Sequence, residues 1–188
     1  ITNLTRRSKN ITIQIDDGSA VLVHLKMTGL LVFKSKDNLI SGGHPITETF
    51  QNKIPNKHTY ITFEFENGDN LYYNDVRQFG YLLYFNTKKN IPADHFKSLG
   101  VEPLSNDFTF DYFYKGLKKT TKKLKFLFLE QTLVVGLGNI YVDESCFRAG
   151  IRPTRKANDL TKKEALRLYE AIKSILKKAI EMHGSSVS

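Results

Sequence analysis

The chain contains little cysteine and no long apolar segment. Cys146 is its only cysteine among 188 residues, which excludes an internal disulfide and a cysteine-rich zinc site within this chain and indicates a reducing compartment. We interpret Cys146 as a core residue on a helix. No apolar run reaches the roughly 20 residues that a membrane span needs, and the first residues lack the apolar segment of a secretory signal. We therefore expect a cytoplasmic protein that does not contact a membrane.

A dinucleotide-binding fingerprint is incomplete in this chain. Gly136 and Gly138 form a Gly-x-Gly turn, but Tyr141 stands where the third glycine belongs, and the apolar spacing before the turn favours a helix over a strand. The turn is suited to hold a phosphate, because Asn139 can cap the next helix and the first N–H groups of that helix carry its positive dipole end. A plain connector between two helices is the alternative. The helix predicted before the turn includes Phe126, Leu127, Leu129, Leu133 and Val134.

Acidic residues are outnumbered by basic ones. The chain has 19 Asp and Glu against 28 Lys and Arg, a net charge of +9. The basic residues are clustered, which favours a polyanionic partner, since neutralising phosphates releases their counterions. A solvated basic surface is the alternative. The clusters are Arg6, Arg7 and Lys9; Lys115, Lys118, Lys119, Lys122, Lys123 and Lys125; and Arg148, Arg152, Arg155 and Lys156.

The first half of the chain alternates apolar and polar residues with a period of two. This pattern, from Ile11 to about Phe85, predicts antiparallel strands. Asp17-Gly18 and Asn67-Gly68 are hairpin turn signals. We expect about six strands in a β-sandwich or flattened barrel over residues 1–85. Lys34 to Asn56 is polar with glycines and prolines, which predicts a long surface loop.

The second half has a helical pattern. Residues 86–104 are interpreted as a linker and residues 105–188 as an α-helical domain, so the expected fold class is α+β. Thr161 and Glu164 form a capping box at the start of the clearest helix, and Gly184 is expected to end it. The predicted buried stripe of this helix is Leu168, Ile172, Ile175, Ala179 and Met182.

Five motifs resemble those of one family, the bacterial formamidopyrimidine-DNA glycosylases (Fpg/MutM, within the Fpg/Nei group). The most specific, Phe126 to Pro153, is similar to the family's helix–two-turn–helix motif. The resemblance implies a DNA glycosylase and abasic-site lyase that flips oxidised purines, such as 8-oxoguanine and formamidopyrimidines, out of damaged duplex DNA and excises them, with no cofactor bound by this chain. The other motifs are Arg6–Lys9, His24–Gly29, Asn74–Gly80 and Leu99–Leu104.

The resemblance also implies roles for single residues. Met27, Arg77 and Phe79 would fill the gap that the flipped base leaves in the duplex. Without the resemblance, core packing for Met27 and an ordinary turn for the other two would be favoured. Lys9 would donate a proton during strand cleavage. The predicted DNA-binding residues are His58, Arg77, Lys122, Lys125 and Asn139. Arg77 would bond to the orphaned base on the opposite strand. His58, Lys125 and Asn139 would contact the DNA backbone, with Lys119 and Lys122 as weaker candidates.

Some features depart from the family pattern. The family's nucleophile is an N-terminal proline followed by glutamate, whereas this chain begins Ile1-Thr2-Asn3, and the zinc finger expected of the full-length family member is not within it. We therefore expect an internal fragment, a monomeric DNA-binding body without catalytic power that associates with the bacterial nucleoid. A non-catalytic nucleic-acid-binding protein with a helix–two-turn–helix is the alternative.

Three single residues also differ from the family's usual ones. Lys26 replaces a usual glycine and Val76 a usual proline, so the turns that aim Met27 and Arg77 are expected to differ slightly from the family's. Gln78 replaces a commonly basic residue, which removes one charge beside the gap-filling residues.

Overall fold

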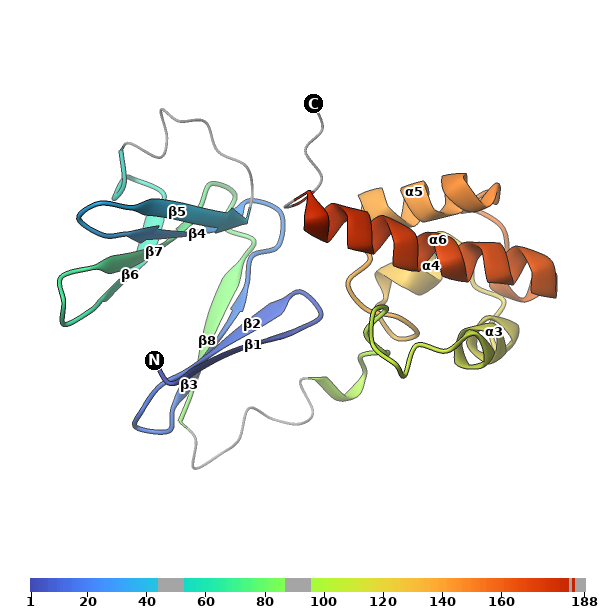
Figure 1. Cartoon of the computed structure of the whole chain (residues 1–188), viewed down its shortest axis with the longest axis horizontal. Helices are drawn as coiled ribbons and strands as arrows, with labels where there is room; N and C mark the ends of the chain where they lie inside the picture. Colours follow the sequence, from blue (N-terminus) through green and yellow to red (C-terminus); the bar gives the residue numbers. More distant parts are fainter. Residues whose placement is uncertain (44–52, 87–95, 183, 185–188) are drawn as a thin grey trace. The chain divides into compact units, whose positions relative to one another are not determined.

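The computed structural model describes residues 1–43, 53–86, 96–182 and 184. The chain forms two compact units, Ile1–Ile91 and Pro92–Ser188, which we name the β unit and the helical unit. In Figure 1 the labelled strands all belong to the β unit and the labelled helices all belong to the helical unit. The predicted α+β class, with strands first and helices afterwards, is confirmed.

The β unit is a sandwich of two four-stranded antiparallel sheets. One has the strand order β1-β2-β3-β8 and the other the order β5-β4-β7-β6. The predicted sandwich is confirmed, with eight strands instead of six among the described residues. The strands are β1 (Asn3–Arg7), β2 (Asn10–Gln14), β3 (Ala20–His24), β4 (Gly29–Lys34), β5 (Leu39–Gly43), β6 (Thr59–Glu64), β7 (Asn70–Asp75) and β8 (Tyr81–Phe85).

The two turn signals in the sequence join neighbouring strands. Asp17-Gly18 connects β2 to β3, and the Asp17 carboxylate accepts a hydrogen bond from Ser19 N at 2.7 Å. Asn67-Gly68 connects β6 to β7, with the Gly68 N–H donating to the Phe65 carbonyl at 2.9 Å. Both hairpin predictions are confirmed. Most residues of the central strands β3 and β4 are buried in the interior of the sandwich.

One strand lies where the sequence predicted a loop. β5 pairs with β4 inside the stretch 34–56, so the interpretation of that whole stretch as a loop is wrong. All five residues of β5 are exposed. The strand therefore lacks the apolar alternation that burial of one face imposes. Residues 44–52 of the predicted loop lie outside the described residues.

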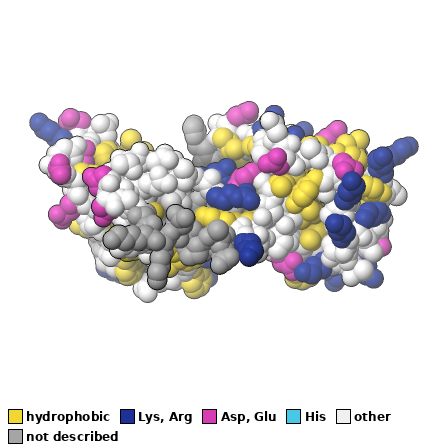
Figure 2. Space-filling model, turned by 90° about the horizontal axis from the view of Figure 1, so that it is seen from below, with side chains coloured by type: hydrophobic (Ala, Val, Ile, Leu, Met, Phe, Trp, Pro, Cys, Tyr) yellow, Lys and Arg dark blue, Asp and Glu magenta, His cyan; other side chains and the backbone are white. Residues whose placement is uncertain are grey.

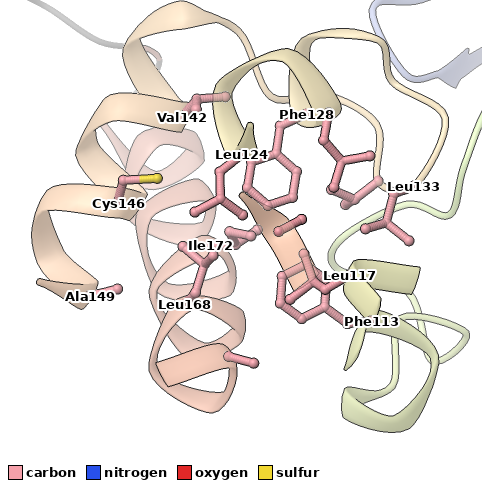
Figure 3. Close-up of a cluster of buried hydrophobic side chains, with 14 of the residues drawn as sticks. Phe113, Leu117, Leu124, Phe128, Leu133, Val142, Cys146, Ala149, Leu168 and Ile172 are labelled. Carbon is pink, nitrogen blue, oxygen red and sulfur yellow. The ribbon is translucent and has the colours of Figure 1, made fainter. Parts of the chain in front are cut away.

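The helical unit packs its helices around one apolar core. Phe113 and Phe128 stack with ring centroids 6.1 Å apart, and Leu168 and Ile172 are fully buried beside them (Figure 3). Cys146 extends from its helix into the same cluster, as predicted for a core residue. The elements are α3 (Phe110–Lys118), α4 (Leu124–Leu129), α5 (Asn139–Ala149), the 3-10 helix η1 (Ala157–Asp159) and α6 (Lys162–Glu181).

Three details of the helix predictions are wrong. α4 ends at Leu129, so Leu133 and Val134 lie in the following loop, where they are apolar because they enter the core. The buried stripe of α6 is complete only in its first half, since Ile175 and Ala179 are partly exposed and Met182 is 56% exposed. Met182 is also the C-cap of α6, two residues before the predicted cap at Gly184.

The capping box at the start of α6 is confirmed, and it predicts a dependence of stability on pH. Thr161 and Glu164 form both reciprocal bonds, and Arg155 contacts the Glu164 carboxylate at 2.5 Å. The hydrogen bond from Arg155, followed by those from Thr161, lowers the Glu164 pKa to about 2 from 4.5. A lowered folded-state pKa means that the stabilisation is complete above the unfolded-state pKa and disappears as the pH falls towards 2.

We therefore expect Glu164→Gln to be less stable than the wild-type chain at neutral pH, with a difference that narrows between pH 4.5 and about 2. Urea unfolding of both proteins across this range measures the difference. Arg155→Met serves as a matched variant and should remove most of the same pH dependence, because it removes the largest cause of the lowered pKa. A constant difference between wild type and Glu164→Gln would contradict the assignment.

Candidate nucleic-acid interface

Three predicted gap-filling residues lie together on two turns of the β unit. Met27 is in the β3–β4 turn, and Arg77 and Phe79 are in the β7–β8 turn. The Arg77 guanidinium lies 4.7 Å from the centre of the Phe79 ring, and Arg77 Nη1 is 3.8 Å from Met27 Sδ. Met27 and Phe79 are 60% and 52% exposed. These three residues, which we call the wedge cluster, therefore form an exposed projection that is both apolar and cationic. The exposure of Met27 excludes the alternative that it packs in the core.

The buried carboxylate of Asp75 holds both turns of the wedge cluster. Its Oδ1 accepts bonds from Thr28 Oγ1 and, at 3.2 Å, from Arg77 N. Its Oδ2 accepts bonds from Gly80 N at 2.7 Å and from the Tyr73 hydroxyl at 3.2 Å. Thr28 belongs to the turn that carries Met27, so one side chain couples two turns that are distant in sequence.

These bonds determine the charge state of Asp75. Desolvation by itself would raise the Asp75 pKa, but the hydrogen bonds from Thr28, Gly80, Arg77 and Tyr73 outweigh it and leave the pKa lowered. Burial, together with the Asp75 charge, raises the Tyr73 pKa to about 12. Asp75 is therefore ionised and Tyr73 neutral at neutral pH, which is the pairing that lets the hydroxyl donate.

The backbone of both turns is constrained. A Cβ at position 80 would meet the Tyr73 hydroxyl, the Asp75 carboxylate and the His24 carbonyl, so only glycine fits there without rearrangement. Lys26 and Gln78 adopt left-handed φ angles of 52° and 57°, which are uncommon for residues with a Cβ. Non-glycine residues held in such conformations are concentrated at functional sites.

His58 lies immediately before β6 and contacts the Asp75 backbone. Its carbonyl accepts a hydrogen bond from Asp75 N at 3.0 Å, and its own N–H donates to Asn56 Oδ1 at 2.9 Å. His58 is therefore fixed through its backbone close to the residue that holds the wedge cluster. Its predicted contact with DNA through the side chain stays a prediction.

Lys9 lies in the turn between β1 and β2, at the same end of the first sheet as the β3–β4 turn. The register shows this, because Asn10 pairs with His24 and His24 pairs with Tyr81. The Lys9 residue as a whole is exposed, yet neighbouring protein atoms desolvate its ammonium group, and this desolvation, with the charge of Lys26, lowers the Lys9 pKa. A lowered pKa makes the ammonium a better proton donor than an ordinary lysine.

The helical unit presents the α4–α5 loop. Gly136 has a φ of 86°, the left-handed conformation that glycine favours. The Gln131 amide bridges this loop, with its Nε2 donating to the carbonyls of Phe128 at 2.7 Å and Leu137 at 2.6 Å. Its Oε1 accepts from Gly136 N at 2.7 Å. Gln131 therefore fixes the loop that leads into α5.

The prediction that Asn139 caps α5 is wrong. Gly138 is the N-cap, with an extended backbone and no side-chain cap bond, and Asn139 is the first helical residue. The helix starts there because the Gly138 carbonyl already accepts from Val142 N at 2.9 Å. The Asn139 side chain is exposed, and the first-turn N–H groups of α5 have no partners within the helix. This end of α5 retains the chemistry of an anion site.

In the helical unit, two of the lysines predicted to contact DNA form ion pairs with acidic residues. Lys122 Nζ lies 2.7 Å from Glu130 Oε2, and Lys125 Nζ lies 2.7 Å from Asp143 Oδ2. Asp143 is on α5, one turn after Asn139, so the Lys125 charge is held beside the start of that helix. A phosphate that binds here competes with a carboxylate, which lowers the net gain from each lysine.

Other lysines of the same cluster also have partners within the helical unit. Lys115 pairs with Asp111 at 2.7 Å, and Lys118 Nζ donates to the Asn158 carbonyl at 2.6 Å. Lys and Arg side chains lie beside Asp and Glu over the helical unit in Figure 2. Among these partners, only Asp111 lies at a spacing from its lysine, four residues, that signals a helical ion pair in the sequence. The usable positive charge is therefore smaller than the composition suggested.

The described residues contain no group of three His, Cys, Asp or Glu side chains placed to hold a metal ion. The zinc implied by the resemblance thus has no ligand set among them. Burial, followed by the Asp143 charge, raises the pKa of the Cys146 thiol to about 11, which makes it a weak nucleophile at neutral pH. None of the described helices has the length and apolar character needed to cross a membrane.

Comparisons with known proteins match both units to one family. The family model described as formamidopyrimidine-DNA glycosylase N-terminal domain matches residues 1–82, and the one described as formamidopyrimidine-DNA glycosylase H2TH domain matches residues 99–188. The formamidopyrimidine-DNA glycosylases of Bacillus licheniformis and Pelotomaculum thermopropionicum are 40% and 38% identical over 187 residues. The alignment includes the whole chain and 62% of each relative's length.

Solved structures give the same result. A Lactococcus lactis formamidopyrimidine-DNA glycosylase bound non-covalently to DNA with an abasic site matches with a TM-score of 0.82 and 37% identity, over all of this chain and 65% of that one. MutM of Thermus thermophilus matches with a TM-score of 0.80 and 36% identity, over all of this chain and 63% of that one. The chain therefore spans about three fifths of the length of these relatives.

Proposed function

The chain belongs to the formamidopyrimidine-DNA glycosylase family, and from this membership we propose that it is the DNA-binding body of a base-excision repair enzyme. In this proposal the enzyme recognises oxidised purines in duplex DNA, flips the damaged base out of the stack, and removes it with cleavage at the abasic site. The wedge cluster carries the proposal, because flipping a base requires groups to fill the gap left in the duplex.

The chemistry of the three wedge residues matches the contents of such a gap. Met27 is flexible and apolar and fills an irregular space. Phe79 presents a flat apolar face that can insert against a neighbouring base pair. Arg77 offers a rigid fork of donors to the unpaired base on the opposite strand. Asp75 holds both turns, so the three side chains are arranged before DNA binds.

The remaining site residues act on the DNA backbone in this proposal. His58 in the β unit, and Lys122, Lys125 and Asn139 in the helical unit, contact phosphates beside the damaged nucleotide. The start of α5 adds its backbone N–H groups and the positive end of its dipole. Lys9 serves as proton donor during strand cleavage, which its lowered pKa supports. Through these contacts the protein associates with the bacterial chromosome.

Binding to duplex DNA that lacks one base tests the proposed repair function. The chain is expected to bind a duplex containing a tetrahydrofuran abasic-site analogue more tightly than the intact duplex. Arg77→Ala should reduce that preference about tenfold, because one well-placed arginine contact to a base contributes about 1–3 kcal/mol. Fluorescence anisotropy at a stated salt concentration measures both affinities.

Lys36→Ala is the matched control for charge. It removes one positive charge from the exposed β4–β5 turn and should change both affinities by the same factor. Equal affinity of the wild-type chain for the two duplexes, left unchanged by Arg77→Ala, would contradict the wedge assignment and with it the proposed function.

A further inference from the structure

An exposed tyrosine is held beside the wedge cluster by a residue that carries no charge. Tyr60 is on β6 and is 46% exposed. Its hydroxyl oxygen accepts a hydrogen bond of 2.6 Å from Gln78 Nε2. Gln78 stands between Arg77 and Phe79 in sequence, so this bond positions the Tyr60 hydroxyl at the edge of the wedge cluster.

The hydroxyl retains a hydrogen that it can donate. A phenol oxygen that accepts one bond still has its own O–H to give to a second acceptor. Within the part of the chain that the structure describes, no such acceptor is found for Tyr60. The bond from Gln78 also polarises the phenol, which makes its O–H a stronger donor. The arrangement thus presents one directed donor on an exposed surface.

The backbone conformation of Gln78 indicates that the β7–β8 turn itself sets the position of the Gln78 side chain beside Tyr60. Gln78 holds a left-handed φ of 57°, an uncommon conformation for a residue with a Cβ. The β7–β8 turn is fixed on either side of it by the bonds of Arg77 N and Gly80 N to Asp75. The constrained β7–β8 turn therefore fixes the direction of the Gln78 side chain, which points towards β6.

We propose that Tyr60, held by Gln78, donates a hydrogen bond to a phosphate of the DNA backbone beside the wedge cluster. The inference rests on the proposed function and extends it by one contact. A phosphate oxygen is the acceptor favoured here, because charged acceptors form the stronger hydrogen bonds and backbone oxygens receive at least half of protein–DNA hydrogen bonds. Since neither side chain is charged, the contact adds affinity without releasing a counterion.

Tyr60→Phe tests the contact by removing one oxygen atom and leaving the ring. We expect it to weaken binding of the tetrahydrofuran duplex about three- to tenfold, the effect of one lost hydrogen bond. The slope of log affinity against log salt should stay unchanged. Gln78→Lys should raise that slope by about one, because it introduces a cation at the same place. Tyr84→Phe, on an exposed tyrosine of β8, is the control and should leave the affinity unchanged.

Three outcomes would overturn the inference. One is an affinity of Tyr60→Phe within twofold of the wild type. Another is a loss of affinity accompanied by an equal loss of thermal stability, which would show that Tyr60 only supports the fold. The third is a smaller salt slope for Tyr60→Phe. If Arg77→Ala abolishes the preference for the tetrahydrofuran duplex while Tyr60→Phe binds normally, the proposed function stands and only this contact fails.

Discussion

Replacing Asp75 with asparagine is expected to destabilise the β unit by about 2–4 kcal/mol and to reduce the preference for abasic DNA. The carboxylate accepts four hydrogen bonds, from Thr28, Tyr73, Arg77 and Gly80. Asparagine has one oxygen and one NH₂ group in the same volume. Its NH₂ group must therefore face two of these donors, whichever way the amide is turned.

The two orientations differ in which bonds they lose. With the NH₂ group at the Oδ2 position, the backbone N–H of Gly80, now 2.7 Å from oxygen, would face another donor and could not rotate away. With the NH₂ group at the Oδ1 position, the Thr28 hydroxyl can turn to accept, but the Arg77 N–H loses its carboxylate partner. Either orientation loosens a turn of the wedge cluster, and both lose the added strength of an ionised acceptor.

Urea unfolding followed by the NMR amide signals of β3, β4 and β7 measures the effect, because the two units can unfold in separate transitions. Asp37→Asn, on an exposed residue of the β4–β5 turn, is the control and should change stability by no more than about 0.5 kcal/mol. An Asp75→Asn protein with wild-type stability and an unchanged preference for the tetrahydrofuran duplex would show that Asp75 does not position the wedge cluster.

Local signals in the sequence correctly predicted those parts of the fold that are determined by residues close together in the chain. The Asp17-Gly18 and Asn67-Gly68 turns and the Thr161–Glu164 capping box are confirmed, because each is determined within four residues. The resemblance supplied Met27, Arg77 and Phe79 as a set, and the structure brings these three side chains into contact. Their roles on DNA stay predictions.

Features that depend on distant residues could not be predicted. In the sequence, Asp75 is one residue of the Asn74–Gly80 motif, with no role predicted for it. Its importance comes from its hydrogen bond with Thr28, which is 47 residues away. The partners of Lys122 and Lys125 are 8 and 18 residues along the chain, beyond the three- and four-residue spacings of helical ion pairs. β5 is exposed along its length and has no apolar alternation to reveal it.

Gln131→Glu is the second substitution with a large expected effect, and it should destabilise the helical unit by about 2–4 kcal/mol at neutral pH. The Gln131 amide donates to two carbonyls, those of Phe128 and Leu137, and accepts from Gly136 N. A carboxylate keeps the acceptor but presents a charged oxygen to both carbonyls. The α4–α5 loop would lose its bridge, and DNA binding through the start of α5 should weaken with it.

The pH dependence of Gln131→Glu distinguishes the loss of hydrogen-bond donors from a change in the shape of the α4–α5 loop. Two facing carbonyls and partial burial disfavour the ionised form, so the pKa of the introduced carboxyl group should be raised on folding. That carboxyl then binds its proton more tightly in the folded state than in the unfolded chain. Stability relative to the wild-type chain should therefore rise as the pH falls through this raised pKa, and the deficit should be largest above it. A protonated carboxyl can donate to one carbonyl only, so the recovery at low pH stays incomplete.

Urea unfolding of the wild-type chain and Gln131→Glu, followed by amide signals of α5 and α6 between pH 7 and about 4, measures this recovery. Gln14→Glu, on an exposed residue of β2, introduces the same charge away from the loop and should leave the helical unit unchanged. If Gln131→Glu shows a deficit that does not shrink towards acid pH, the cost comes from altered packing and not from the two carbonyls that lost their donor. The shape of the α4–α5 loop would then depend on Gly136 and the surrounding core more than on the Gln131 bridge.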